Sequence, residues 1–459
     1  MPAIVCRAAY SPAASALAHS KSHRLVSHAF TPHCHNRRRP CNCAAFTTYY
    51  TAPAVHPPTP PLSSASPAAT TANATSLHAP RLRVSLLSAP THLGHFTSRV
   101  TRLSNEDRYS IGMIQVPAST SLTPRSRRVT LPTATTAKPH MRDVFYYSIF
   151  DGHGGADCSD FLARHLANYI ETCDVTTAEE LERKWRDNIG GYWSRWKGHF
   201  ERYRRMITDD NDLPLRIPLA FLQADYDYIV AERPAGSTCT SVLIYGDKDS
   251  IGAESLPYFA PGASATMLVA HVGDTRCVLC DRNGLAHALT AAHHLSSPIE
   301  SSRLRRYAAS FFTDSFGEER FGNVENTRAF GDRAMKGLGV SAEPDMTTYS
   351  LGAGPDAHDG FGGNESFLVL VSDGVSKFVS DQEIVDIVTS VGYRSGYVRG
   401  TPQDAAKEVV NFAEAIGGDD NATCLVVRLS GWGSWTSPVD RTGDLREYRL
   451  RQAMETRRQ

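Results

Sequence analysis

Acidic side chains stand at the ends of predicted strands in several separate parts of this chain. Glu106-Asp107 precede a predicted strand, Asp151 and Asp373 each follow one, and Asp419-Asp420 precede another. Hard divalent cations such as Mg²⁺ and Mn²⁺ take several oxygen ligands, which carboxylates can supply. Because strand ends can converge at one edge of a sheet sandwich, these acids could hold two ions together. A pair of ions of this kind clamps the in-line displacement of a phosphoryl group.

Each acidic position has a plainer explanation when it is taken alone. Asp-Gly is a common turn dipeptide, and Asp419-Asp420 after two glycines fits a solvated loop. After Asp151 and Asp373, however, the chain has helical rather than strand periodicity, which a simple hairpin turn does not explain. The joint pattern therefore favours a metal site over a set of unrelated turns.

The elements that must position these acids follow the order strands, helices, then strands again. Strands are predicted at 109–116, 144–150, 238–245, 265–272, 367–371 and 422–429, and helices at 156–170, 218–230, 402–416 and from Ser380 or Asp381 onward. Gly273-Asp274 is predicted to be the turn of a hairpin with a return strand at 276–281. The Trp-rich segment 177–206 is predicted to be helical, with a break at Gly190-Gly191. This order favours an α+β fold with antiparallel sheets covered by helices.

The first 105 residues contain 10 Lys and Arg but no Asp or Glu. An acid-free segment with Arg and Ser has the composition of an organelle transit peptide, and its weak apolar periodicity predicts disorder. We favour a mitochondrial presequence and linker over 1–90, with an ordinary disordered tail as the alternative. A catalytic domain is predicted at 91–430. A basic tail or helix is predicted at 431–459, and a frayed, solvated tail is favoured there.

Charge and cysteine content exclude several classes of protein. The whole chain holds 48 basic and 48 acidic residues, so the part after residue 105 carries 48 − 10 = 38 bases and a net charge of −10. A nucleic-acid footprint is therefore not expected. No apolar stretch of about 18 residues occurs, so no transmembrane helix is predicted. A His/Cys group at 33–43 lacks the spacing of a zinc finger. The cysteines beside apolar runs are predicted to be reduced core residues, namely Cys158, Cys173, Cys239, Cys277, Cys280 and Cys424.

The run Phe-Asp-Gly-His-Gly-Gly at 150–155 resembles the signature of the metal-dependent, type 2C Ser/Thr protein phosphatases. Further segments match that family in order between about residues 95 and 430, namely 102–107, 236–240, 269–276, 327–332, 342–345, 372–374 and 420–422. Together with the acid-free N-terminus, they make the chain most similar to fungal mitochondrial members of the family. The resemblance implies a sandwich of two antiparallel β-sheets flanked by α-helices.

The resemblance also implies a set of metal ligands for two Mn²⁺ or Mg²⁺ ions. The matching residues are Glu106, Asp107, Asp151, Gly152, Asp373 and Asp420. Asp151 would bridge both ions, and the Gly152 carbonyl would ligate one of them. Asp373 and Asp420 would ligate the other ion. Glu106 would act largely through water, and Asp107 would support the cluster nearby.

Two further side chains gain catalytic roles from the same resemblance. Arg102 would hold the substrate phosphate, since a guanidinium pairs bidentately with phosphate oxygens. His153 would be the general acid that protonates the Ser or Thr leaving oxygen, with a purely structural histidine as the alternative. Hydrolysis would proceed by direct attack of a water that bridges the metal ions at Asp151, without a phosphoenzyme.

Two departures from the family pattern bear on a third, loosely held metal ion at Asp274, a residue that a plain turn also explains. The family usually has a Trp-Asp pair where this chain has Ser376-Lys377, and an acid is missing at Ala292. Positive charge on Lys377 should weaken a third site. The segment 295–325 would include a mobile flap, so substrate contacts are expected to differ. Asp332 is expected to have a structural role.

These inferences predict a monomeric mitochondrial enzyme that removes phosphate from Ser and Thr of proteins, with matrix enzymes such as the pyruvate dehydrogenase complex as substrates. The alternative is a catalytically inactive pseudo-phosphatase that acts as a binding or regulatory module. That alternative predicts lost ligands, whereas Asp151, Asp373 and Asp420 are all present. An enzyme for a small phosphorylated substrate also stays open, because the flap and groove set that choice. The ordered matches argue against an unrelated metal hydrolase.

Overall fold

The computed structural model describes residues 47–51, 81–117, 141–208, 211–246, 257–305, 311–313, 319–321, 325–354, 360–394, 397–398, 400–435 and 440–456. The chain divides into two units, Met1–Val84 and Ser85–Gln459. In the N-terminal region, β1 (Thr47–Thr51) pairs with β2 (Arg81–Ser85) as a two-stranded sheet. Most of the predicted presequence lies outside the described residues, so the domain boundaries stay predictions.

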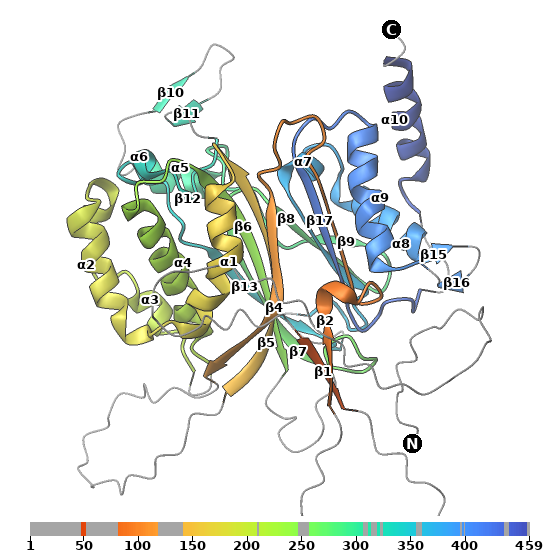
Figure 1. The fold of residues 1–459 in the computed structure, drawn as a ribbon, viewed down its shortest axis with the longest axis horizontal. Helices are drawn as coiled ribbons and strands as arrows, with labels where there is room; N and C mark the ends of the chain where they lie inside the picture. Colours follow the sequence, from red (N-terminus) through yellow and green to blue (C-terminus); the bar gives the residue numbers. More distant parts are fainter. Residues whose placement is uncertain are drawn as a thin grey trace, which may run out of the picture. The chain divides into compact units, whose positions relative to one another are not determined.

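The first large sheet of the second unit has six strands (Figure 1). Its path is β13-β7-β6-β5-β4, every pair is antiparallel, and β12 joins it beside β6. The strands are β4 (Arg108–Pro117), β5 (Met141–His153), β6 (Gly236–Gly246), β7 (Ala265–Val272), β12 (Phe330–Gly331) and β13 (Asp345–Leu351). Ten of the eleven residues of β6 are buried, which fits a strand paired on both edges inside the sandwich.

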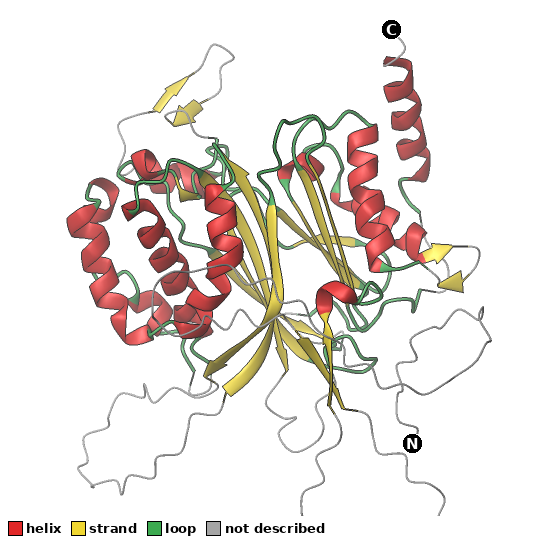
Figure 2. Ribbon diagram, viewed as in Figure 1, coloured by secondary structure: helices red, strands yellow, loops and turns green. Residues whose placement is uncertain are grey.

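The second large sheet has five antiparallel strands in the order β3-β17-β14-β8-β9. They are β3 (Leu93–Ser98), β8 (Arg276–Cys280), β9 (Ala286–Ala288), β14 (Phe367–Val371) and β17 (Ala422–Arg428). The predicted strand at 367–371 is confirmed as β14, which is central in the sheet and fully buried. Figure 2 shows the two sheets with helices on their outer sides, so the predicted sandwich fold is confirmed.

The predicted hairpin around Gly273-Asp274 is wrong. β8 pairs with β14 and β9 in the second sheet, whereas β7 belongs to the first. The reason is that β7 already uses both of its edges, one for β6 and one for β13, so β8 has no free edge to join. The short turn therefore carries the chain from one sheet to the other, with Gly273 at φ 100°.

Helices α1 (Asp157–Thr172) and α4 (Leu213–Val230) lie over the first sheet, and α2 (Ala178–Asn188) packs against α4 further from the sheet (Figure 1). Helix α4 begins five residues before the predicted start at Pro218, which lies inside it. The buried ion pair between Asp212 and Arg216, at 2.6 Å, anchors this early start. Arg216 also donates to the carbonyls of Ile170 and Cys173, and so satisfies the C-terminal end of α1.

The Trp-rich segment packs against the helical layer rather than standing free. Trp185 and Trp193 are fully buried, with ring centroids 4.1 Å apart. The predicted break at Gly190-Gly191 is confirmed, because both residues have positive φ. The short elements here are η2 (Val175–Thr177), η3 (Gly191–Arg195) and α3 (Glu201–Arg204).

Helices α8 (Asp381–Gly392) and α9 (Pro402–Ala415) cover the second sheet. Helix α8 begins at Asp381, as predicted, with a capping box in which Ser380 and Glu383 satisfy each other's backbone N–H groups. The remaining elements are η1 (Leu86–Ser88), α5 (Pro298–Arg305), β10 (Phe311–Thr313), β11 (Glu319–Phe321), α6 (Arg333–Lys336), α7 (Asp373–Ser376), β15 (Tyr393–Arg394) and β16 (Tyr397–Val398).

The C-terminal segment forms a helix, α10 (Gly443–Thr456), and not the favoured frayed tail. Arg449 pairs with the nearly buried Glu383 at 2.8 Å and donates to the Phe378 carbonyl. These contacts hold the helix on α8 although it buries no residue fully. Among the described residues, no helix is long and apolar enough to cross a membrane. The six described cysteines are free, as predicted.

Candidate metal centre

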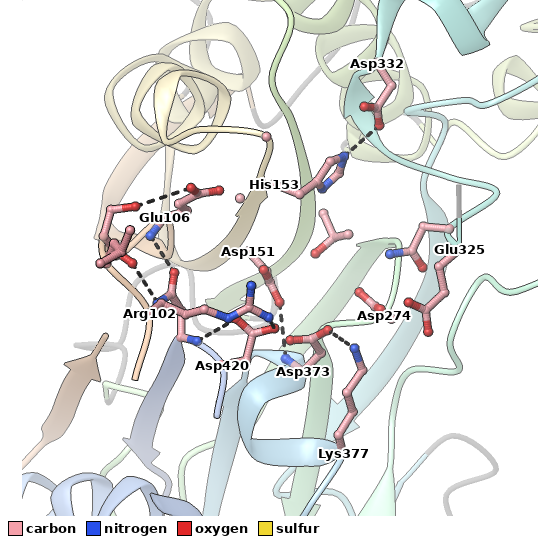
Figure 3. A pocket seen from close by; sticks show the side chains of 17 residues that line it. Arg102, Glu106, Asp151, His153, Asp274, Glu325, Asp332, Asp373, Lys377 and Asp420 are labelled. Atoms are coloured by element: carbon pink, nitrogen blue, oxygen red, sulfur yellow. Dashed lines mark hydrogen bonds and ion pairs between the residues drawn. The ribbon is translucent and has the colours of Figure 1, made fainter. Parts of the chain in front are cut away.

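Acidic residues from both sheets meet at one end of the sandwich, around a cavity of about 690 Å³ (Figure 3). Asp151 lies near the end of β5, and Asp274 follows β7, both in the first sheet. Asp373 follows β14 and Asp420 precedes β17, both in the second sheet. Glu106 enters from the segment before β4. The sandwich thus brings together acids that are far apart in the sequence.

Three of these acids form the centre of the cluster. Carboxylate oxygens of Asp151, Asp274 and Asp373 all lie within 4.8 Å of one another. The Asp373 backbone N–H donates to Asp151 at 3.3 Å. Burial, and then the charges of Asp107, Asp373 and Asp274, raise the pKa of Asp151 well above its ordinary value. A group of hard oxygen donors with net negative charge is what a Mg²⁺ or Mn²⁺ ion requires.

The residue after Asp151 is a glycine, and the structure has no space for a side chain there. A Cβ atom on Gly152 would lie 2.6 Å from the Glu106 carbonyl oxygen, so glycine permits this close approach. The Glu106 carboxylate accepts from the Gly155 N–H at 3.0 Å, and its own N–H donates to Asn421 at 2.7 Å. Glu106 is therefore oriented from both sheets and faces the cavity.

Asp107 lies behind the cavity instead of lining it. The side chain is 2 % exposed, and one oxygen accepts from Ser372 and Thr423, each at 2.7 Å. The other oxygen has no hydrogen-bond partner. Burial raises the pKa of Asp107 to about 7, although the two hydroxyls favour the ionised form. The carboxylate therefore ties β4 to β14 and β17 directly beneath the cluster.

Arg102 stands at the rim of the cavity, where its guanidinium pairs with Asp420 at 2.8 Å. The Arg102 side chain is 57 % exposed, so this pair contributes little to stability. A phosphate dianion could compete for the same guanidinium, because a planar fork matches two phosphate oxygens. The structure therefore places Arg102 beside one predicted ligand and open to solvent.

His153 is held by Asp332, a residue whose direct contact with the site sequence reasoning missed. The two side chains are joined by a hydrogen bond of 2.9 Å. Burial lowers the pKa of His153, but the bond to Asp332 and nearby acids outweigh that effect and raise it. Asp332 has φ 48°, in the left-handed region. The family motif at 327–332 was the signal in the sequence for this contact, because Asp332 is its only acid and lines the cavity.

Two basic side chains contact two of these three central acids, Asp373 and Asp274. Lys377 pairs with Asp373 at 2.6 Å, and His294 lies 3.3 Å from Asp274. Burial alone would raise the pKa of Asp274, but hydrogen bonds from His294 and Asn326 and the charge of Lys377 lower it. His294 was not a predicted site residue. Its position in the altered segment after Ala292 was the only signal in the sequence.

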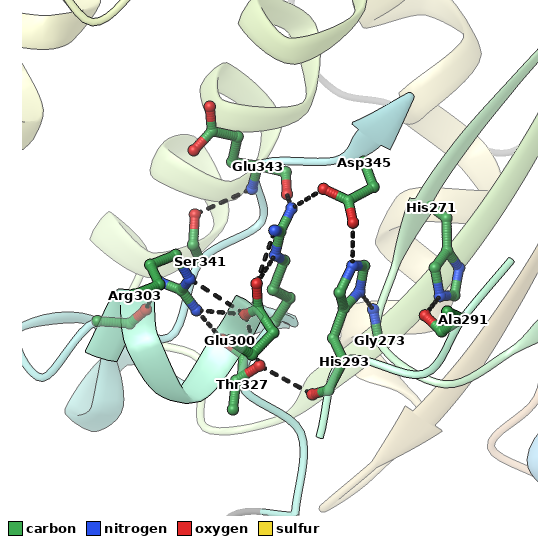
Figure 4. Close-up of polar contacts among 12 residues, drawn as sticks. His271, Gly273, Ala291, His293, Glu300, Arg303, Thr327, Ser341, Glu343 and Asp345 are labelled. Carbon is green, nitrogen blue, oxygen red and sulfur yellow. Dashed lines mark hydrogen bonds and ion pairs between the residues drawn. The ribbon is translucent and has the colours of Figure 1, made fainter. Parts of the chain in front are cut away.

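A buried polar network supports the turn that carries Asp274 (Figure 4). The Gly273 N–H donates to His293 at 3.0 Å, and His293 contacts Asp345 at 2.9 Å. Arg328 joins Asp345 to Glu300, with 2.7 Å to each carboxylate. The segment from α5 through β13 thus fixes one wall of the site.

Replacing Glu300 with glutamine is expected to lower the free energy of unfolding by about 2 kcal/mol at pH 7, since charged hydrogen bonds become neutral ones. Burial raises the pKa of Glu300, but Arg303 and Arg328 outweigh it and hold the pKa well below its ordinary value. The charge therefore stabilises the fold above the unfolded pKa, and this contribution is lost as pH falls. Urea unfolding of both proteins should show a constant difference at neutral pH that narrows under acid. A constant difference down to pH 3 would contradict this account.

The fold and the acid cluster define a class, the metal-dependent hydrolases that hold their ions between two antiparallel sheets. Residues 122–422 match the family model described as "Protein phosphatase 2C". The chain is 37% identical over 359 residues to "Protein phosphatase 2C homolog 4" of Schizosaccharomyces pombe, covering 77% of this chain and 84% of that protein. This chain belongs to the protein phosphatase 2C family, and it is a metal-dependent protein Ser/Thr phosphatase that acts on phosphoproteins.

More distant relatives are also similar to this chain. "Protein phosphatase 1K, mitochondrial" of Xenopus laevis is 25% identical over 359 residues, covering 78% of this chain and 72% of that protein. The solved structure "Crystal structure of serine-threonine phosphatase 2C from Toxoplasma gondii" has a TM-score of 0.47 at 16% identity. It covers 73% of this chain and 94% of that chain. That likeness is too distant to support an argument.

Proposed function

We propose that the protein binds two Mn²⁺ or Mg²⁺ ions in this cavity and hydrolyses phosphoserine and phosphothreonine in other proteins. The observation that carries the proposal is the group of three carboxylates within 4.8 Å of one another, in which the pKa of Asp151 is raised. Asp151 and the Gly152 carbonyl would hold one ion, and Asp151, Asp373 and Asp420 the other, with Glu106 acting through water. Asp107 would support this set from behind. Bound ions would supply positive charge that activates a water and neutralises the phosphate.

Two side chains of the rim would handle the substrate itself. Arg102 would turn from Asp420 to the phosphate, since its side chain is exposed and its ion pair with Asp420 is a weak surface interaction. His153 would donate a proton to the leaving oxygen, and its contact with Asp332 favours the protonated imidazole. The cavity includes both residues in its lining.

Replacement of His153 by asparagine tests this assignment through the leaving group. A Ser or Thr alkoxide is a poor leaving group and needs a proton, whereas a nitrophenolate does not. We expect kcat for a phosphothreonine peptide to fall by about 10²–10⁴-fold. Activity on p-nitrophenyl phosphate should fall far less. Equal losses on both substrates would show that His153 shapes the site and does not act as the acid.

The central test is phosphate release from a phosphothreonine peptide by the full chain, with Mn²⁺ and with a chelator. Activity should require the ion and disappear in Asp373→Asn. The matched control is Asp187→Asn on α2, where the side chain is 57% exposed and remote from the cavity. A folded wild-type protein that binds Mn²⁺ but releases no phosphate from several phosphopeptides would instead favour the pseudo-phosphatase. Activity restricted to small phosphate esters would favour the small-substrate enzyme.

We further propose a monomer in the mitochondrial matrix with phosphorylated matrix enzymes, such as the pyruvate dehydrogenase complex, as substrates. The support is the acid-free N-terminal composition and one relative whose name places it in mitochondria. Incubating the full chain with isolated, energised mitochondria tests this placement. A protease-protected and shortened product is expected, and a fully degraded chain would contradict it.

A further inference from the structure

Lys377 is a basic side chain that contacts the centre of the acid cluster. It directly follows α7, four residues after Asp373, and its ammonium lies 2.6 Å from that carboxylate. Figure 3 shows it entering from the side of the cavity that also carries Asp274 and Glu325. A lysine ammonium paired with a carboxylate carries its charge at neutral pH.

Basic side chains are divided unevenly among the three central acids. Lys377 contacts Asp373 and His294 contacts Asp274. Among the described residues, Asp151 accepts the backbone N–H of Asp373 and forms no ion pair with a basic side chain. The charge of Asp151 is therefore left for ions from solution, whereas the outer position, between Asp274 and Asp373, is already partly neutralised by Lys377.

An ammonium in this place opposes a further divalent ion in two ways. It occupies one oxygen of Asp373 and leaves the other for one of the two proposed ions, and it repels any further cation held against Asp274. We propose that Lys377 is a resident cation that takes the outer position, so that the enzyme binds two divalent ions and no third. This inference rests on the proposed two-ion function.

Counting bound Mn²⁺ by isothermal titration calorimetry on the full chain tests the inference without measuring activity. Wild type is expected to bind two ions, and Lys377→Asp three, because that change removes the ammonium and adds an oxygen ligand. Adding Asp274→Asn to Lys377→Asp should return the count to two. A third ion on wild type, or only two on Lys377→Asp, would overturn the inference.

Lys377→Met serves as the matched variant, since it keeps the length of the side chain without charge or oxygen. It should bind a third ion more weakly than Lys377→Asp, and it decides the question if the aspartate variant fails to fold. Two ions on a folded Lys377→Met would then overturn the inference. Failure of the proposed function looks different, because wild type would then bind no Mn²⁺ or release no phosphate from phosphopeptides.

Discussion

Replacing Asp151 with asparagine should abolish nearly all phosphatase activity, with kcat falling by at least about 10²–10³-fold. Removing a single group that stabilises the transition state electrostatically causes a loss of this size in other enzymes. Asp151 is the carboxylate that the proposed ions would share, and both Asp274 and Asp373 lie within 4.8 Å of it. An amide keeps the shape but contributes no charge. Phosphate release at saturating Mn²⁺ is the measurement.

The same substitution should stabilise the protein when no metal is present. Burial and neighbouring acids raise the pKa of Asp151, so the folded state disfavours its charge at pH 7. Asparagine removes that penalty, and thermal unfolding in chelator should shift to higher temperature while stabilisation by Mn²⁺ is lost. Functional sites commonly store instability of this kind. A variant that unfolds more easily in chelator and keeps its activity would refute both the assignment and its electrostatic cause.

Replacing Lys336 with methionine should lower the free energy of unfolding by about 3–5 kcal/mol, because it leaves a buried carboxylate without its partner. Lys336 and Asp225 are both fully buried and 2.5 Å apart. Lys336 also donates to the Ala329 carbonyl, and Asp225 accepts from the Gly331 N–H. The pair therefore fixes the turn that presents Asp332 to His153. Urea unfolding at pH 7 measures the change.

The double variant Lys336→Met with Asp225→Asn is the control for this interpretation. Burial raises the pKa of Asp225 to about 6 even beside Lys336, so an unpaired carboxylate there is costly. Asparagine removes the charge while its oxygen still accepts from Gly331. The double variant should recover most of the lost stability. If it is as unstable as the single variant, packing around Lys336 rather than charge explains the loss.

Local pattern was enough to predict most individual elements. The apolar run of β14, the capping box of α8 and the glycine break in the Trp-rich segment depend on neighbours a few residues away. The pairing partner of β8, however, does not depend on residues nearby in the sequence. The turn at Gly273-Asp274 looks like a hairpin locally, and only the occupied edges of β7 send the next strand to the other sheet.

The sequence by itself determined which acids could serve as metal ligands and the order in which they occur, because Asp151, Asp373 and Asp420 each stand at the end of a strand. Only the tertiary structure decided what surrounds each one. Asp332 reaches His153, and Lys377 neutralises Asp373. The physical reason is that side-chain chemistry is local, whereas pKa values and ion pairs depend on groups brought close through space. The charge balance that decides how many ions can bind is therefore a property of the fold.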